Sequence, residues 1–208
     1  MKTLLKLCLT LMLSVALVFG FNNDASASTV HTVKSGDTMW KIALVYQVGV
    51  SEIINANPQI SNPNSIYPGQ KINIPTLSTA TTNVEDQVVQ LVNQERAKNG
   101  LKPLKSNWEL ARVARYKSQD MIDKRYFDHN SPTYGTPFQM MKNFGISYRS
   151  AGENIAAGQA TPKEVVQAWM NSEGHRKNIL SSNFTEIGVG YVKGGSYGHY
   201  WTQMFIGR

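Results

Sequence analysis

The chain has 208 residues, with 21 lysines and arginines against 14 aspartates and glutamates, which gives a formal net charge of +7. This length allows one ordinary domain and a small one, and the positive charge favours polyanionic partners such as anionic wall polymers. Nucleic acid is the competing polyanion. The sequence contains no arginine-rich or lysine-rich run and no nucleic-acid-binding motif, so we expect no nucleic-acid partner.

Residues 1–27 have the features of a secretory signal peptide. Two lysines precede the apolar stretch 7–21, and Ala25-Ser26-Ala27 forms an A-x-A cleavage site. The apolar stretch is shorter than the roughly 20 residues that a membrane-spanning helix needs. We therefore expect a secreted chain that begins near Ser28, with no stable membrane anchor after cleavage. The single cysteine, Cys8, would leave with the signal, so the mature chain would have no disulfide and no cysteine-bound metal.

The rest of the chain divides at an uncharged stretch, residues 76–83, which reads as a short flexible linker between residues 28–75 and 84–208. In the first block, the alternating residues 31–34 and 71–74 predict two short strands. Between them, a helix capped by Asp37 or Thr38 and carrying Trp40 is expected, followed by a second helix capped by Ser51.

The first block resembles a LysM domain. The resemblance rests on three segments in order: residues 31–43, residues 55–60 and residues 67–75. It implies a βααβ fold that binds N-acetylglucosamine-containing glycans such as peptidoglycan or a chitin-like polymer. The glycan-binding positions that carry over are Gly36, Asp37, Thr38 and Met39 in the first loop, and Asn57, Pro58, Gln59 and Ile60 in the second.

An acetamido sugar needs backbone donors and acceptors together with an apolar floor. Gly36 allows close backbone approach, and Met39 and Ile60 would supply the floor. The alternatives are that residues 36–38 only form a turn and a helix cap, and that Met39 and Ile60 belong to the core.

The larger block predicts four helices followed by two strands. Helices are expected from about residue 84 to Gly100, from a capping box at residues 106–109, from Thr136-Pro137, and from a second capping box at residues 161–164. The alternating residues 186–192 and 199–206 predict two antiparallel strands that helices must cover. We therefore expect an α+β sandwich. The core is expected to take in four aromatic residues: Trp108, Trp169, Trp201 and Phe205.

Five motifs in this block resemble the CAP superfamily (the SCP-like extracellular domain) in its bacterial form. They are Asn93-Gln94-Glu95-Arg96, Phe127-Asp128-His129, Gly152-Glu153-Asn154-Ile155, residues 174–180 and residues 184–190. The resemblance implies a three-layer α-β-α sandwich with a cavity lined by two histidines and two acidic residues. His129, Glu153 and His175 carry over directly. Glu173 is the fourth, at a position that varies in bacterial members.

These four residues allow several chemistries. Imidazole and carboxylate groups are suitable ligands for zinc or another divalent metal, so His129, Glu153 and His175 are candidate metal ligands that would activate a water molecule. Glu173 and His175 are two residues apart and would not share a helix face, so we expect an irregular turn at Gly174 to bring them together. The alternatives are that paired glutamates act as acid and base on a glycosidic bond, or that all four are only structural polar residues.

Three functions remain open on the sequence alone. The first is a wall-associated binding protein, anchored by its LysM domain and presenting a CAP cavity to a ligand, metal or partner. The second is a metal-dependent hydrolase acting on peptidoglycan or envelope protein, and the third is a structural layer protein of a cell wall or spore envelope. We rank binding first because no G-x-S-x-G or H-E-x-x-H motif is present.

Overall fold

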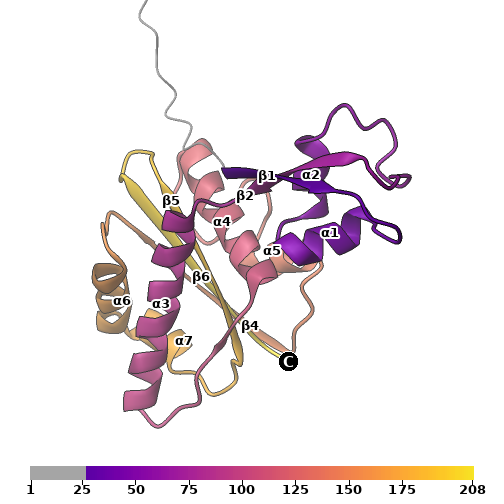
Figure 1. Cartoon of the computed structure of the whole chain (residues 1–208). Coiled ribbons are helices and arrows are strands. Elements are labelled where there is room, and N and C mark those ends of the chain that lie inside the picture. The colour runs from indigo at the N-terminus through magenta and orange to yellow at the C-terminus, as the bar shows by residue number, and fades with distance from the viewer. Residues whose placement is uncertain (1–26) are drawn as a thin grey trace, which may run out of the picture.

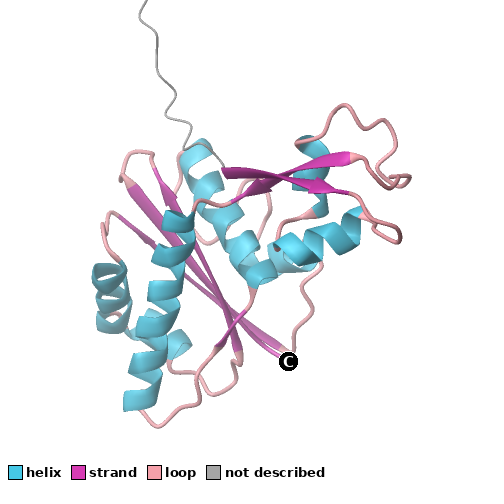
Figure 2. Ribbon diagram, viewed as in Figure 1, coloured by secondary structure: helices cyan, strands magenta, loops and turns pink. Residues whose placement is uncertain are grey.

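The computed structural model describes residues 27–208, which form a small N-terminal body and a larger C-terminal one (Figures 1 and 2). The expected signal peptide lies outside the described residues except for Ala27, and Cys8 lies outside them too. Within residues 27–208, no helix combines the length and the apolar character that crossing a bilayer requires.

The small body has the expected order of strand, helix, helix and strand. Its elements are β1 (Ala27–Thr32), α1 (Met39–Tyr46), α2 (Val50–Asn55) and β2 (Lys71–Thr76). β1 pairs antiparallel with β2, with Thr29 opposite Ile74. The inner face of this two-stranded sheet and the two helices enclose a compact core built from Val33, Ile42, Ile53, Ile72 and Ile74.

Three local expectations for this body were wrong. β1 lies earlier than the predicted strand at residues 31–34. α2 begins at Val50, two residues earlier than a Ser51 cap implies. Its N-cap is Gly49, which has no side chain to cap the helix, so Ser51 lies inside the helix. Trp40, expected on the apolar face of α1, is 63% exposed.

The connection between the two bodies is much shorter than predicted. Only two residues separate the end of β2 from the start of α3 (Thr79–Lys98), and the side chain of its N-cap, Ser78, accepts a hydrogen bond from the Thr81 amide. The expected flexible linker at residues 76–83 is therefore wrong over most of its length. A run of small, uncharged residues is typical of a linker, but here it forms the first turns of a helix.

The larger body is a four-stranded sheet between two layers of helices. The strands are β3 (Lys105–Ser106), β4 (Ser150–Ala157), β5 (Glu186–Lys193) and β6 (His199–Gly207), in the order β3-β5-β6-β4. The remaining helices are α4 (Trp108–Asp123), α5 (Pro137–Asn143), α6 (Pro162–Asn171) and α7 (Glu173–Ile179). β4, read from the sequence as a loop, pairs with β6 along its whole length.

The alternation of side chains along β6 separates the two cores. Trp201 and Phe205 point toward Val88 of α3 and Trp169 of α6, whereas Met204 and Ile206 pack on Leu110 and Val113 of α4. The predicted three-layer α-β-α sandwich is confirmed. Of the four aromatic residues expected in the core, three are fully buried, and Trp108 is only partly buried.

α4 lies unusually close to β5 because two glycines face it. A Cβ atom at Gly188 would collide with the backbone of Leu110 and Ala111, and one at Gly190 with the backbone of Ala114 and Arg115. The Gly188-Val189-Gly190 pattern therefore allows direct contact between helix and strand. This contact fixes α4, which supports the candidate site described below.

α4 also begins differently from the prediction. Its N-cap is Asn107, whose side chain accepts from the Leu110 amide, and not Ser106 of the predicted capping box. Ser106 instead belongs to β3, which pairs in parallel with β5.

Candidate functional site

Lys117 of α4 holds the loop that carries His129 through hydrogen bonds. The Lys117 ammonium donates to the Tyr126 hydroxyl at 3.1 Å and to the carbonyls of Asp128 at 2.7 Å and His129 at 2.9 Å. Lys117 is 1% exposed, and burial lowers its pKa. All three ammonium protons thus fix one loop, and nothing in the sequence pattern marked this lysine as buried.

One turn further along α4, Asp120 holds the same loop through three hydroxyl groups. It accepts hydrogen bonds from Tyr126 at 2.6 Å, from Ser131 at 2.7 Å and from Thr133. Burial alone would raise the pKa of Asp120, but these hydrogen bonds outweigh it and the pKa is lowered. Lys117 and Asp120 are therefore two charged side chains of α4 that together hold the loop carrying His129.

His129 and Glu153 are in direct contact. His129 Nδ1 lies 2.7 Å from Glu153 Oε1, with the imidazole side chain 50% exposed and the carboxyl side chain 2% exposed. The hydrogen bond to Glu153 raises the pKa of His129, and burial raises the pKa of Glu153. Glu153 Oε2 is buried and has no hydrogen-bond partner within the described chain. The His129–Glu153 pair can therefore share a proton between a half-exposed imidazole and a buried carboxyl group.

Side-chain amides connect the strand of Glu153 to the helix of His175. Asn154 Nδ2 donates to the His175 carbonyl at 3.1 Å. Asn178 Nδ2 donates to the Glu153 carbonyl at 3.2 Å and to Asn154 Oδ1 at 2.9 Å. Burial and then the charge of nearby His129 lower the pKa of His175. The structure therefore gathers His129, Glu153 and His175 in one region.

Glu173 does not join this group. It lies exposed in the first turn of α7 and makes no hydrogen bond or ion pair within residues 27–208. The irregular turn expected at Gly174 was wrong, because residues 173–179 form a continuous helix. Two residues apart on a helix, Glu173 and His175 point in different directions. The proposed role of Glu173 stays a prediction.

The described residues do not assemble a ready metal centre. Among residues 27–208, no three or more histidine, cysteine, aspartate or glutamate side chains are placed so that they could hold a metal ion together. His129 and Glu153 make contact, but as a hydrogen-bonded pair. The assignment of His129, Glu153 and His175 as ligands of zinc or another divalent ion therefore stays a prediction.

The first predicted glycan loop uses most of its side chains to hold its own turn. Asp37 accepts from the Lys34 amide at 2.7 Å and from His31 Nε2 at 2.9 Å, and these hydrogen bonds lower its pKa. Thr38 caps α1 by accepting from the Lys41 amide. Met39 lies in the module's core and Gly36 adopts a φ of +84°. Gly36 and Thr38 remain exposed to a ligand.

The second predicted loop borders a surface hollow. Asn57 is buried, where its side-chain amide accepts from the Asn73 amide at 2.8 Å and donates to the Ile53 and Asn73 carbonyls. Pro58 is exposed. A hollow of about 400 Å³ lies beyond it, lined by Gln59, Ile60, Ser61, Asn62, Ser65, Tyr67 and Gln70. Tyr67, read from the sequence only as part of a turn, is 67% exposed.

The two bodies meet at an ion pair that the sequence did not reveal. Arg112 of α4 donates through Nε and Nη2 to the Glu52 carboxylate of α2, and the Tyr116 hydroxyl donates to the same carboxylate at 2.8 Å. Gly49 lies against this guanidinium, because a Cβ atom there would collide with it.

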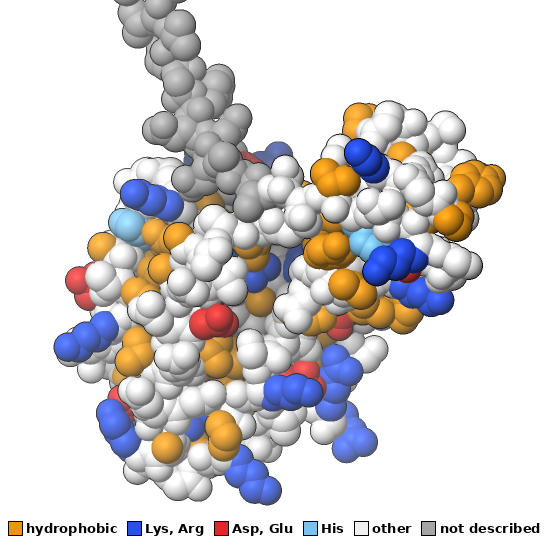
Figure 3. Space-filling model, in the orientation of Figure 1, with side chains coloured by type: hydrophobic (Ala, Val, Ile, Leu, Met, Phe, Trp, Pro, Cys, Tyr) orange, Lys and Arg blue, Asp and Glu red, His pale blue; other side chains and the backbone are white. Residues whose placement is uncertain are grey.

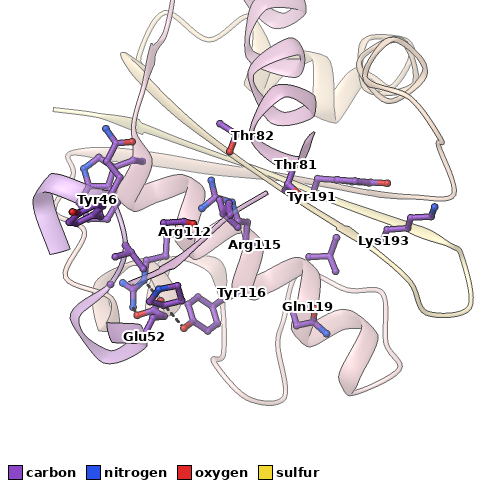
Figure 4. A pocket seen from close by; sticks show the side chains of 18 residues that line it. Tyr46, Glu52, Thr81, Thr82, Arg112, Arg115, Tyr116, Gln119, Tyr191 and Lys193 are labelled. Atoms are coloured by element: carbon purple, nitrogen blue, oxygen red, sulfur yellow. Dashed lines mark hydrogen bonds and ion pairs between the residues drawn. The ribbon is translucent and has the colours of Figure 1, made fainter. Parts of the chain in front are cut away.

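Beside this ion pair, a larger cavity of about 600 Å³ opens between the bodies, which we term the interdomain pocket. Figure 3 shows a recess there with cationic side chains inside it, and Figure 4 shows the residues that line it. α4 supplies one wall, with Trp108, Arg112, Arg115 and Gln119 at helical spacing.

Comparisons with known proteins agree with this architecture. The family model of the cysteine-rich secretory protein family (CAP) matches residues 89–205, which is more than half of the chain, and the LysM domain model matches residues 31–75. The chain therefore belongs to the CAP family and carries a LysM domain ahead of its CAP domain. The described CAP domain contains no cysteine, despite the family's descriptive name.

Three relatives place it more closely. Uncharacterized protein YkwD of Bacillus subtilis is 63% identical over 140 residues, which cover 67% of this chain and 53% of that protein. An extracellular protein from Bacillus anthracis that contains an SCP domain has a solved structure with a TM-score of 0.57 and 36% identity, covering 68% of this chain and 47% of that one. A probable autolysin, SsaALP of Staphylococcus aureus, is 46% identical over 61 residues, 29% of this chain and 22% of that protein. The chain thus spans about half the length of the first two.

Proposed function

We propose that this protein is retained on the bacterial cell wall, where the LysM domain binds N-acetylglucosamine-containing glycan and the CAP domain offers the His129–Glu153–His175 region to a ligand. The hollow bordered by Gln59, Ile60 and Tyr67, next to the predicted second glycan loop, is the observation that carries the glycan assignment. The match to LysM and the likeness to a probable autolysin support it. So does the net positive charge, since anionic polymers accompany wall glycan.

The chemistry of the hollow suits an acetamido sugar. The side-chain amides of Gln59, Asn62 and Gln70 offer donors and acceptors to the N-acetyl group and the ring hydroxyls. The exposed ring of Tyr67 offers an apolar face, and its hydroxyl is held by Ser65 at 2.8 Å. Ile60 supplies apolar contact for the acetyl methyl group.

Retention on purified wall sacculi tests this assignment. We expect residues 28–208 to sediment with sacculi at moderate salt, and Tyr67→Ala to reduce the bound fraction several-fold. Tyr197→Ala is the matched control, because Tyr197 is a comparably exposed tyrosine on the CAP domain. Equal retention by walls stripped of their glycan strands would show that another polymer holds the protein.

One observation favours hydrolysis as a second candidate for the CAP domain. Glu153 Oε2 is a buried carboxylate oxygen with no partner in the described chain, and a bound group would satisfy it. Glu153 also holds His129 Nδ1, which leaves the outer imidazole nitrogen to accept or deliver a proton. In this reading His129 is the acid–base group and Glu153 is its positioning residue.

Activity assays separate the two candidates. Purified residues 28–208 would be incubated with purified wall and with casein, alongside His129→Ala and His175→Ala, and bound metal would be measured in each preparation. Ligand or metal binding without turnover supports the binding function. Turnover that is lost in both variants would instead establish the hydrolase.

A further inference from the structure

The interdomain pocket shares no lining residue with the glycan hollow or with the His129–Glu153 pair. Its lining contains three cationic side chains. Arg112 and Arg115 are three residues apart on α4, so their side chains are neighbours on one helix face. Figure 4 shows both guanidinium groups at the pocket wall. Lys193 is a third cation at the rim, and Glu52 is the one carboxylate that lines the pocket.

Each arginine is held along one edge by its own glutamate. Arg112 uses Nε and Nη2 for Glu52, and Arg115 uses Nε and Nη2 for Glu85. Within residues 27–208, the Nη1 group of neither arginine makes a hydrogen bond. The two side chains are 21% and 20% exposed. Two fixed guanidinium groups that line the pocket thus each keep an Nη1 donor without a partner in the described chain.

This arrangement is suited to binding an anion. Guanidinium donors recognise carboxylate and phosphate oxygens through directional, charge-assisted hydrogen bonds. Because the glutamates already fix both side chains, a ligand would lose little affinity to the ordering of arginine rotamers. Glu52 does not compete for the ligand's donors, because Arg112, Tyr116 and Ser51 already occupy its oxygens.

The rest of the pocket indicates which anion fits. Apolar side chains such as Val48, Pro75, Leu77 and Val192 line the pocket together with the rings of Trp108 and Tyr191. A volume of about 600 Å³ lies within the range of small-ligand sites. A polyol phosphate has no apolar groups to place against these walls. A short peptide of small residues that ends in a free carboxylate has both a charged end and methyl groups.

We propose that the interdomain pocket binds short peptides of small apolar residues through their terminal carboxylate, with Nη1 of Arg112 and Arg115 as the donors. The site is separate from glycan retention. A protein that fails to bind sacculi can therefore still bind the peptide, and the reverse is also true.

Nuclear magnetic resonance of residues 28–208 tests the proposal with trialanine as the probe. Trp108 lines the pocket, and its indole N–H signal can be assigned with Trp108→Phe. We expect trialanine to shift this signal saturably, while trialanine amide, which lacks the carboxylate, binds at least tenfold more weakly. Equal shifts with the acid and the amide, or no shift with either, would overturn the proposal. An equal shift with inorganic phosphate would overturn it in favour of a general anion site.

Variants locate the binding groups. Arg112→Lys keeps the positive charge but removes the planar fork, and we expect about tenfold weaker binding, the value of one charge-assisted hydrogen bond. Arg149→Lys, at an exposed arginine outside the pocket, is the matched control. Thr82→Trp places a bulky ring in the pocket from α3 and should abolish binding while the melting temperature stays unchanged. Undiminished binding by Thr82→Trp would place the peptide elsewhere.

Discussion

Glu52 of the LysM domain and Arg112 of the CAP domain, 60 positions apart in the chain, form an ion pair with two hydrogen bonds between them. Burial acts to raise the pKa of Glu52, but hydrogen bonds from Arg112, Ser51 and Tyr116 prevail and lower it. Burial, and next the hydrogen bond to Glu52, raises the pKa of Tyr116 to about 12. The pair therefore stays ionised at neutral pH and joins the two domains.

Neutralising Glu52 should loosen the junction. We expect Glu52→Gln to cost about 1 kcal/mol of stability at neutral pH, since both partners are partly solvated, and to speed proteolysis near Leu77. The pKa of Glu52 in the folded protein lies below its ordinary value of 4.5. The stabilisation is therefore present above that value and lost as pH falls through the lowered pKa. Glu95→Gln, which breaks the exposed Glu95–Lys98 pair on α3, is the control. Identical proteolysis in both variants would mean that the ion pair does not hold the domains together.

Closing the gap between α4 and β5 should unfold the CAP domain. Gly190→Ala places a methyl group against the backbone of Ala114 and Arg115, which neither element can avoid by a rotamer change. We expect a loss of about 3 kcal/mol or more in urea denaturation. Gly174→Ala in α7 meets nothing within 4 Å and should be neutral or stabilising by up to about 1 kcal/mol. Similar midpoints for the two variants would contradict the direct helix–strand contact.

Removing the Lys117 ammonium should release the loop that carries His129. Lys117→Met fills similar space but leaves the Asp128 and His129 carbonyls without their donor. We expect a loss of about 2–4 kcal/mol and faster amide hydrogen exchange across residues 126–133. Lys163→Met, at an exposed lysine of α6, should change neither quantity. Unaltered exchange in the loop would show that Asp120 alone holds it.

The His129–Glu153 contact should be visible in a histidine titration. Glu153→Gln replaces the carboxylate acceptor, which raises the pKa of His129, with a neutral amide, so we expect that pKa to fall toward its ordinary value of 6.5. The measurement is the pH dependence of the imidazole proton signals. Glu173→Gln is the comparison, and it should leave the His129 titration unchanged because Glu173 makes no contact with the pair. A shift of equal size in Glu173→Gln would return Glu173 to the site.

The same variant should also change how stability depends on pH. The pKa values of His129 and of Glu153 are both raised in the folded protein, so the folded state binds more protons than the unfolded state. Their contribution is full below the ordinary values of 4.5 for Glu153 and 6.5 for His129, and it is lost as pH rises through the raised values. Denaturation across that range should therefore show a steeper decline for the wild type than for Glu153→Gln. Parallel curves would contradict the raised values.

Sequence patterns predicted the fold class because hydrophobic period and turn residues are local signals. The strands at Lys71–Thr76, Glu186–Lys193 and His199–Gly207 follow plain alternation. β4 was missed because it is buried along most of its length and carries Gly152, Glu153 and Asn154. Those residue types are typical of a loop, and here β6 and Asn178 satisfy their backbone polar groups.

The site was predictable only in part. Recognisable motifs indicated His129, Glu153 and His175, and the structure gathers them. Lys117 and Asp120 were not predicted, because a charged residue in an amphipathic helix normally faces water and only the tertiary fold buries these two. Arg112 was missed for the same reason, since its partner is 60 residues away.

Only Leu77 and Ser78 separate the last strand of the LysM domain from the first helix of the CAP domain. For a protein held on a polymer by one domain, such a join leaves the other domain almost no slack. If the LysM domain binds wall glycan as proposed, the CAP domain would meet only material directly beside the bound sugar. To reach another part of the wall, the whole protein would have to dissociate and rebind. The residence time of the LysM domain on glycan would then limit how fast the CAP domain meets new material.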